Sequence, residues 1–397
     1  MGNKKKIKIL YITFSPIDMN TSATIRNKAL IKGLVKNGAK IDLLTLTAAR
    51  DNNYFDSIVD SIDGVNIIKL KQNAAYLAMV KHDESLKGKL KKKILPIARR
   101  IYHSFNLYDN SILVAKNIGK DILPSDYYDI IITSSDPKTS HIAAQKLIDL
   151  GLNYGKWIQY WGDPLSIDIT NKSLYPKWYV RKVEENIIKM ADTIIYVSPF
   201  TLREQMKLFP KYSEKMSFLP VPYLEPKFSK NKQEYNKKIT LGYFGDYHSS
   251  IRDIRPLYEF AKKSGDGLII AGNADLNLKS SENVTIYPRL CLEEITKLET
   301  VSDILVCILN KRGTQIPGKL YHYAATNKPI LVILDGEYRK EIADYLRSFN
   351  RYILCDNNEQ DIKQAINKIK GQNYTWEPSP YFSPEAIAKK FLEISMN

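Results

Sequence analysis

The chain has 397 residues, which is more than one ordinary hydrophobic core accommodates and suits two domains. Hydrophobic residues make up 44% of the sequence, which excludes a disordered chain, and no apolar run approaches the roughly 18 residues that a membrane-spanning helix needs. The formal charge of +16 indicates an anionic partner such as nucleic acid, anionic lipid or a phosphorylated substrate.

The cysteine pattern and the amino-terminal sequence both favour a cytoplasmic protein. Cys291, Cys307 and Cys355 are far apart, which excludes a cysteine-based zinc knuckle and fits a reducing compartment. The basic start of the chain leads directly into a predicted strand, with no cleavage site behind it.

The first half of the chain alternates predicted strands and helices. A β-branched run over 5–16 is followed by a helix pattern over 20–38, which has Asn, Thr and Ser caps at its start and Gly38 at its end, and then by a strand over 39–46. The same order recurs in "YDIIITSS", a helix over 141–150, "KWIQYW", a helix over 179–190 and "DTIIYVS". This alternation predicts a parallel sheet that is covered by helices on both faces.

The pattern breaks over residues 211–240, which are rich in Pro, Lys and Asn, and then restarts. Strands are predicted at "ITLGYFGDY", "GLIIAG", "NVTIYP", "DILVCIL", "PILVIL" and "RYILCD", with helices between most of them. We therefore predict an α/β fold with an amino-terminal domain over 1–220, a linker over 221–237 and a second doubly wound domain over 238–375. A last helix over 376–397 is expected to cross back to the first domain.

Three stretches of the second half carry a resemblance to a known family. They read "YFGDYHSSIRDIRPL", "NVTIYPRLCLEEITKL" and "IPGKLYHYAATNKPILVI". They resemble the carboxyl-terminal, donor-binding domain of GT-B glycosyltransferases, and most of all the large retaining group numbered four. The resemblance implies two Rossmann-like domains that face each other across a cleft, with ligands at the carboxyl ends of the strands.

The third stretch is the predicted diphosphate site. Gly318 and Lys319 begin a predicted helix, where backbone N–H groups and the helix dipole favour an anion, and Pro317 and Gly318 let the backbone approach it. The family usually carries two glutamates eight positions apart in this segment, the second of which holds the ribose. Thr314 and His322 stand there instead, so a ribose contact through the imidazole nitrogens is one interpretation and a packed helix residue is the other. Gln315 is placed with this donor-binding loop.

Two further loops of the second domain are assigned to the donor by resemblance. The family places an Arg after the first strand and a Lys six residues later, both on the phosphates, whereas this chain has Asp246 and Arg252. Arg252 keeps a guanidinium suited to phosphate, while Asp246 is expected to orient an arginine or a sugar hydroxyl. The loop "YPRL" corresponds to the one that reads the nucleobase, which makes Arg289 and Leu290 candidate contacts.

The acceptor candidates lie in the first domain. Asp163, in "QYWGDPLSID", follows a predicted strand and could hydrogen-bond or deprotonate an acceptor hydroxyl, although an Asp between Gly and Pro is also a turn former. Ser22, Arg26 and Trp161 are assigned to the same acceptor side. The sequence has no D-x-D, H-E-x-x-H or G-x-G-x-x-G motif and no Walker loop, so we expect no metal and no cofactor beyond a nucleotide sugar as co-substrate.

The stretch Lys87–Arg100 holds seven basic residues and no acidic ones, interleaved with Leu, Ile and Ala. It is either a solvated face or a site of docking on an anionic membrane; nucleic acid is the competing partner, but no RNA-binding motif accompanies the charge. The sequence thus predicts a metal-independent, retaining glycosyltransferase of bacterial surface-glycan synthesis, peripheral on the inner face of the plasma membrane. Its acceptor would be a saccharide or lipid-linked saccharide. A nucleotide-sugar epimerase and a non-catalytic subunit are the alternatives.

Overall fold

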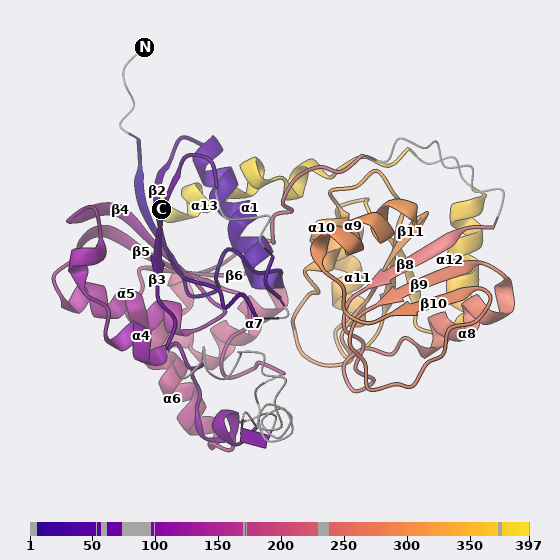
Figure 1. The fold of residues 1–397 in the computed structure, drawn as a ribbon, viewed down its shortest axis with the longest axis horizontal. Coiled ribbons are helices and arrows are strands. Elements are labelled where there is room, and N and C mark those ends of the chain that lie inside the picture. Colours follow the sequence, from indigo (N-terminus) through magenta and orange to yellow (C-terminus); the bar gives the residue numbers. More distant parts are fainter. Residues whose placement is uncertain are drawn as a thin grey trace, which may run out of the picture. The chain divides into compact units, whose positions relative to one another are not determined.

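The chain forms two compact units. Met1–Pro220 together with Pro384–Asn397 makes unit 1, and Val221–Ser383 makes unit 2. The structure is a computed structural model, shown in Figure 1, which describes residues 6–52, 54–56, 62–73, 97–98, 100–169, 171, 173–228, 238–371 and 375–396. Among the helices within these ranges, none is both long and apolar enough to cross a membrane.

Unit 1 is built on a seven-stranded sheet in the order β3-β2-β1-β4-β5-β6-β7. All neighbouring strands pair in parallel, as the alternating sequence pattern predicts. The strands are β1 (Lys8–Thr13), β2 (Lys40–Leu46), β3 (Val65–Leu70), β4 (Tyr127–Ser134), β5 (Asn153–Trp161), β6 (Thr193–Tyr196) and β7 (Met216–Phe218). Its described helices are α1 (Ser22–Lys36), α4 (Ile112–Lys116), α5 (Thr139–Asp149), α6 (Lys177–Ile188), α7 (Pro199–Leu208) and α13 (Pro384–Met396), with 3-10 turns η2 (Lys120–Ile122) and η3 (Pro210–Lys215).

Both faces of the unit 1 sheet are covered by apolar side chains. Along β1, Ile9 and Tyr11 point into one core, while Leu10 and Ile12 point into another, because successive residues of a strand face opposite sides. The first core includes residues of α1 and α13, and the second includes residues of α4 and α5. Gly33 of α1 has no room for a Cβ, since the backbone of Pro384 fills that space, so α13 lies directly against α1 (Figure 1).

Unit 2 is a six-stranded parallel sheet in the order β10-β9-β8-β11-β12-β13. The strands are β8 (Thr240–Phe244), β9 (Gly267–Ala271), β10 (Val284–Tyr287), β11 (Ile304–Ile308), β12 (Ile330–Leu334) and β13 (Ile353–Asp356). The helices are α8 (Arg255–Ser264), α9 (Leu292–Val301), α10 (Lys319–Tyr323), α11 (Arg339–Arg347) and α12 (Glu359–Lys370), with the 3-10 turn η4 (Pro380–Phe382).

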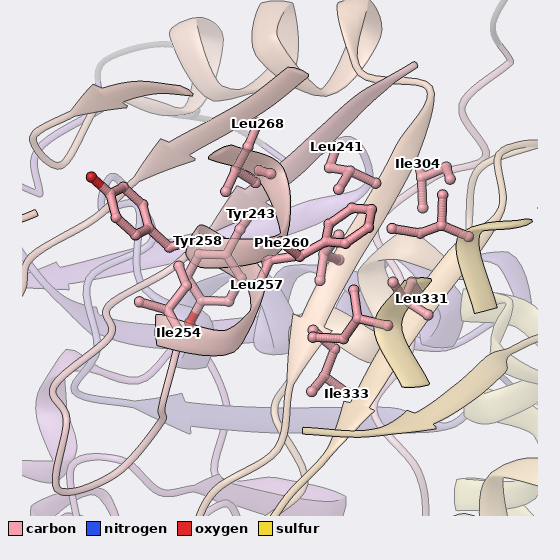
Figure 2. Packing of buried hydrophobic residues seen from close by; sticks show 14 of the residues in the cluster. Leu241, Tyr243, Ile254, Leu257, Tyr258, Phe260, Leu268, Ile304, Leu331 and Ile333 are labelled. Atoms are coloured by element: carbon pink, nitrogen blue, oxygen red, sulfur yellow. The ribbon is translucent and has the colours of Figure 1, made fainter. Parts of the chain in front are cut away.

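One face of this sheet packs on α8 and α12. Figure 2 shows Leu257 and Phe260 of α8 against Leu241 of β8 and Leu331 of β12, all within one buried cluster. α8 ends at Gly265, whose φ of 75° is in the left-handed region that favours glycine. The parallel order places the loops after β8, β9, β10 and β11 at one edge of the sheet, where the candidate site lies.

Candidate functional site

The loops after β8, β9 and β10 are joined by a carboxylate at the carboxyl edge of the unit 2 sheet. One oxygen of Asp246 accepts a hydrogen bond from the backbone N–H of Asn273 at 2.9 Å, and the other pairs with Nη1 of Arg289 at 3.1 Å. Asp246 thus pairs with an arginine from another loop. The hydroxyl of Tyr243 donates to the backbone carbonyl of Asp246 at 3.2 Å, which also holds the turn after β8 in place.

Arg252 is held in place by two of its three guanidinium nitrogens. Nε donates to Oδ1 of Asn310 at 2.9 Å, and Nη1 donates to the backbone carbonyl of Asp246 at 3.1 Å. Asn310 follows β11 and reaches the carbonyl of Gln315, so the loop that contains Gln315 is tied to Arg252. The side chain of Arg252 also forms a hydrogen bond with the hydroxyl of Tyr243.

Lys319 is the first residue of α10 and shares a carboxylate with a second lysine. Its Nζ lies 3.8 Å from Glu299, whose other oxygen pairs with Lys227 at 2.9 Å. Burial lowers the pKa of Lys319, opposed by Glu299, while the nearby Lys227 and Arg289 lower it further. Two lysines on one carboxylate leave a net positive charge.

The helix that Lys319 begins is short. Gly318 stands at its N-cap, but α10 has only five residues, so its dipole is small and the side chains must supply most of the attraction for an anion. Pro317 and Thr314 of the preceding loop are buried. Leu290, in the loop after β10, is half-buried.

His322 lies one turn into α10. Burial lowers its pKa to about 3, and the positive charges of Lys319 and Lys227 act in the same direction, so the imidazole is neutral at neutral pH. Its Nε2 is buried and has no hydrogen-bond partner. A neutral imidazole has one nitrogen that donates a hydrogen bond and one that accepts.

The carboxyl edge of the unit 1 sheet holds a buried arginine. Arg26 of α1 donates from Nη2 to Oγ of Ser134 at 3.3 Å and to the carbonyl of Ser135, and its guanidinium lies 5.0 Å from the ring centre of Tyr160. Gly162 has no Cβ to collide with this guanidinium, so the chain after β5 can pass close to it. Arg26 therefore braces the loops after β4 and β5.

Asp163 belongs to a group of carboxylates beside one lysine. Burial raises the pKa of Asp163 to about 7, and the charges of Asp136 and Asp168 raise it while Lys138 and Arg26 lower it. Lys138 pairs with Asp136 at 2.5 Å and with Asp168 at 3.3 Å. A carboxyl group with a pKa near neutrality can both accept and release a proton under physiological conditions.

Buried side chains from α6, β5 and α5 lie near these carboxylates. Glu184 of α6 accepts a hydrogen bond from the backbone N–H of Ser166 at 2.7 Å, and burial raises its pKa. The indole of Trp161 is fully buried and stacks on His141 at 4.4 Å, so it lies in the core rather than on an acceptor surface. Ser22 is exposed at the start of α1.

Several members of these two clusters were not among the residues singled out from the sequence. They are Asp136, Lys138, Asp168 and Glu184 in unit 1, and Lys227, Glu299, Asn273 and Asn310 in unit 2. Asp136 and Asn310 directly follow predicted strands, which is the signal that could have identified them. Within the described ranges, no group of three His, Cys, Asp or Glu side chains is arranged to hold a metal ion.

Comparisons with known proteins place the chain by its fold. The sequence matches no protein-family model and no curated protein sequence. The catalytic domain of starch synthase IV from Arabidopsis thaliana, bound to ADP and acarbose, has a TM-score of 0.62 at 11% identity, over 98% of both chains. Sucrose-phosphate synthase from Thermosynechococcus elongatus has a TM-score of 0.58 at 13% identity, over 98% of both chains.

A third similar structure is an alpha-glucosyltransferase in complex with UDP and a DNA 13-mer that contains an HMU base. Its TM-score is 0.56 at 11% identity, over 99% of this chain and 100% of the other. All three are glycosyltransferases of GT-B type. The chain therefore has the GT-B fold that the sequence predicted.

Proposed function

We propose that the protein transfers a sugar from a nucleotide-diphosphate sugar to a hydroxyl group of a saccharide or lipid-linked saccharide. The observation that carries this proposal is the gathering of Arg252, Arg289 and Lys319 at one edge of the unit 2 sheet, on a GT-B fold. Asp246 pairs with Arg289, Glu299 pairs with Lys319 and Lys227, and Lys227 adds another cation. A diphosphate supplies the negative charge that such a site lacks.

In the proposed reaction the acceptor oxygen bonds to the anomeric carbon while the bond from that carbon to the diphosphate oxygen breaks. Negative charge then develops on the leaving diphosphate. Lys319 and the guanidinium of Arg252 stabilise it, and a site of fixed charges needs no reorganisation to do so. The retaining outcome remains a proposal that rests on the family resemblance. Metal independence remains a proposal that rests on the lack of D-x-D and H-E-x-x-H motifs in the sequence.

The ribose and base of the donor are assigned to the neighbouring side chains. His322 offers its unpartnered Nε2 to a ribose hydroxyl, as a neutral imidazole. Arg289 and Leu290 are proposed to border the base. Thr314, Gln315, Pro317 and Gly318 complete the donor loop, and Thr314, being buried, acts through the shape of that loop.

The acceptor is assigned to unit 1. Asp163 in its carboxylate form is proposed to accept a hydrogen bond or the proton from the acceptor hydroxyl. Its pKa near 7 leaves a large share of the carboxylate form at neutral pH. Arg26 fixes the loops that carry this group, and Ser22 lies on the same side of α1.

A membrane-bound acceptor is supported by an exposed apolar patch on unit 1. Ile97, Ile101 and Phe105 are each four residues apart on one helical face and are 56 to 61% exposed. Hydrogen bonds from the backbone N–H of Leu174 to Ser104 and from the hydroxyl of Tyr175 to Phe105 bring Leu174 and Trp178, also exposed, to the same region.

Charge accompanies this patch. Arg100, Lys177, Arg181 and Lys182 are exposed on the two helices, and an apolar surface with aromatic and basic residues is typical of proteins that dock on anionic lipid. Most of Lys87–Arg100 lies outside the described residues. We propose that the protein docks through this region on the inner face of the plasma membrane and acts in bacterial surface-glycan synthesis.

Sedimentation with vesicles tests the docking. Changing Ile101 and Trp178 to Ser should lower binding to anionic vesicles, and so should changing four of the lysines Lys87, Lys89, Lys91, Lys92 and Lys93 to Gln. Lys389→Gln with Lys390→Gln, on the exposed side of α13, is the matched charge control. Equal binding by all variants, or no binding by the parent, would remove the membrane assignment.

A turnover assay separates the main proposal from its alternatives. The full chain is incubated with a panel of nucleotide sugars, with and without saccharide acceptors, and free nucleoside diphosphate and sugar isomers are measured. A transferase releases diphosphate faster when an acceptor is present. Isomerisation of the donor alone would indicate an epimerase, and binding without any turnover would indicate a non-catalytic subunit.

A further inference from the structure

Glu299 is a buried carboxylate beside the candidate donor site. It lies on the last turn of α9, and its side chain is only 11% exposed. Oε2 accepts a hydrogen bond from Nζ of Lys227 at 2.9 Å, whereas Oε1 lies 3.8 Å from Nζ of Lys319. Hydrogen bonds from nitrogen to oxygen are about 2.7 to 3.2 Å long, so Glu299 is bonded to Lys227 and only close to Lys319.

The ammonium group of Lys319 therefore keeps its hydrogen-bond donors. The side chain is 38% exposed, and Nζ makes no hydrogen bond to any other residue in the described part of the chain. Its other neighbour is the ring of Tyr323, whose centre lies 5.7 Å away. A lysine ammonium has three N–H donors, and here they are available to an oxyanion.

The backbone holds Lys227 against the chain that follows α10. The N–H of Lys227 donates to the carbonyl of Ala325 at 2.8 Å, and Lys227 forms a parallel bridge with Thr326. Lys319 begins α10, which ends two residues before Ala325. One short stretch of chain thus carries Lys319 and also fixes the lysine that pairs with Glu299.

The three charges of this group depend on each other. Burial lowers the pKa of Lys319, Glu299 raises it and Lys227 lowers it, so both neighbours act on the Lys319 ammonium. If Lys227 were absent, Glu299 would remain as a buried carboxylate without its hydrogen-bond partner, which is a strongly unfavourable state. Lys319, with its Nζ at 3.8 Å, is placed to replace Lys227 on this carboxylate.

We propose that Lys227 is a positioning residue of the donor site, which engages Glu299 and so keeps the ammonium of Lys319 available for the diphosphate. This inference rests on the proposed function, in which Lys319 binds that diphosphate. Lys227 acts through Glu299 and does not need to contact the donor. When Lys227 is removed, Glu299 pairs with Lys319 and neutralises it, and the diphosphate loses a hydrogen-bond donor and a charge.

Calorimetric titration of the full chain at pH 7 with UDP, ADP and inorganic pyrophosphate tests this role. The anion that binds most tightly to the parent is then used with all variants. Lys227→Met should weaken its binding about tenfold, because a hydrogen bond between Lys319 and a charged group is lost. Lys227→Arg keeps a cation on Glu299 and should bind like the parent. Lys238→Met, at an exposed lysine just before β8, is the matched charge control and should also bind like the parent.

A double-mutant cycle with Glu299 separates positioning from direct contact. Glu299→Gln removes the negative charge that would pair with Lys319, so this variant should bind at least as tightly as the parent. Adding Lys227→Met to Glu299→Gln should weaken binding at most about threefold, since only the screened, long-range attraction of one charge is then lost. A lysine that contacts the diphosphate itself would cost the same factor with Glu299 and with Gln at this position.

The inference is overturned if Lys227→Met binds like the parent, or if Lys227→Met costs the same factor in both members of the cycle. Either result leaves the donor site of the proposed function standing. If none of the three anions binds to the parent, the donor site itself is wrong and this inference is overturned with it. Thermal unfolding checks that each variant is folded, and Lys227→Gln, which is also neutral, replaces Lys227→Met if that variant does not fold.

Discussion

Asp163→Asn should stabilise unit 1 at high pH while removing its activity. Burial and the neighbouring Asp136 and Asp168 raise the pKa of Asp163 from 3.8 to about 7, so ionisation of this group opposes folding. Asp163 releases its proton near pH 4 in the unfolded chain and near pH 7 in the folded chain. The free energy of unfolding is therefore unaffected by its ionisation below about pH 4, and it falls as the pH rises from there to about 7. At about 1.36 kcal/mol per pH unit, the loss is about 4 kcal/mol.

Asparagine has the same shape as aspartate and no charge, so the free energy of unfolding of the variant does not fall with pH for this reason. Urea unfolding at pH 5 and pH 8 measures it, and tryptophan fluorescence reports mainly on unit 1, which contains three of the four tryptophans. Because part of the loss is already present at pH 5, the gain of Asp163→Asn over the parent should be about 2 to 3 kcal/mol larger at pH 8 than at pH 5. Asp126→Asn, at a 91% exposed side chain, is the control and should show no such difference. If Asp163→Asn and the parent lose stability equally between the two pH values, the raised pKa is refuted.

Four further outcomes follow from the same contacts. The kcat/KM of the parent should fall about tenfold from pH 8 to pH 6, because the carboxylate of Asp163 is protonated below its pKa of about 7, and a flat profile would exclude it as the proton acceptor. Lys319→Ala and Arg252→Ala should each weaken binding of a nucleoside diphosphate by about 1.5 to 3 kcal/mol in calorimetry, and unchanged affinity in both would mean that the donor site lies elsewhere. His322→Ala should raise the KM for the donor and His322→Glu should restore it, whereas parental kinetics in His322→Ala would make this residue a packing residue. Lys328→Met should lower the free energy of unfolding by about 2 to 4 kcal/mol, because Nζ of Lys328 donates to the carbonyls of Glu299, Thr300 and Ser302 at the end of α9. A loss below about 0.5 kcal/mol, which is typical of a surface substitution, would contradict this.

The order of elements was predictable from the sequence because each strand and helix carries its own local signal. β-branched runs such as β12 and helix patterns such as α1, which Thr21 caps by accepting from the N–H of Thr24, are set by neighbouring residues. Two short strands were not anticipated. β3 is only partly buried and so lacks a strong apolar pattern, and β7 has three residues within a stretch rich in lysine and proline.

The site residues on strand ends were predictable, but their partners were not. Asp246, Arg252 and Asp163 follow strands, and the parallel order brings such positions to one edge. Glu299 lies on the last turn of α9 and Lys227 lies before β8, so their pairing depends on how distant segments pack. The same is true of Lys138, which two aspartates from different loops reach.

The length of α10 shows a further limit of local signals. The sequence marks its start at Gly318 and Lys319. Just after its end, the carbonyls of Ala325 and Thr326 accept hydrogen bonds from distant residues, namely the backbone N–H of Lys227 and Nη2 of Arg351. Sequence patterns therefore mark where this helix begins, but its length, and with it the strength of its dipole, is known only from the structure.

The most direct test of the donor site is a calorimetric titration of the full chain with a panel of nucleoside diphosphates, repeated on a variant that combines Lys319→Ala with Arg252→Ala. The account predicts that at least one diphosphate binds saturably to the parent, and that the double variant loses most or all of this binding while keeping its thermal unfolding temperature. Absence of binding to the parent by every diphosphate, or equal binding by the double variant, would contradict it.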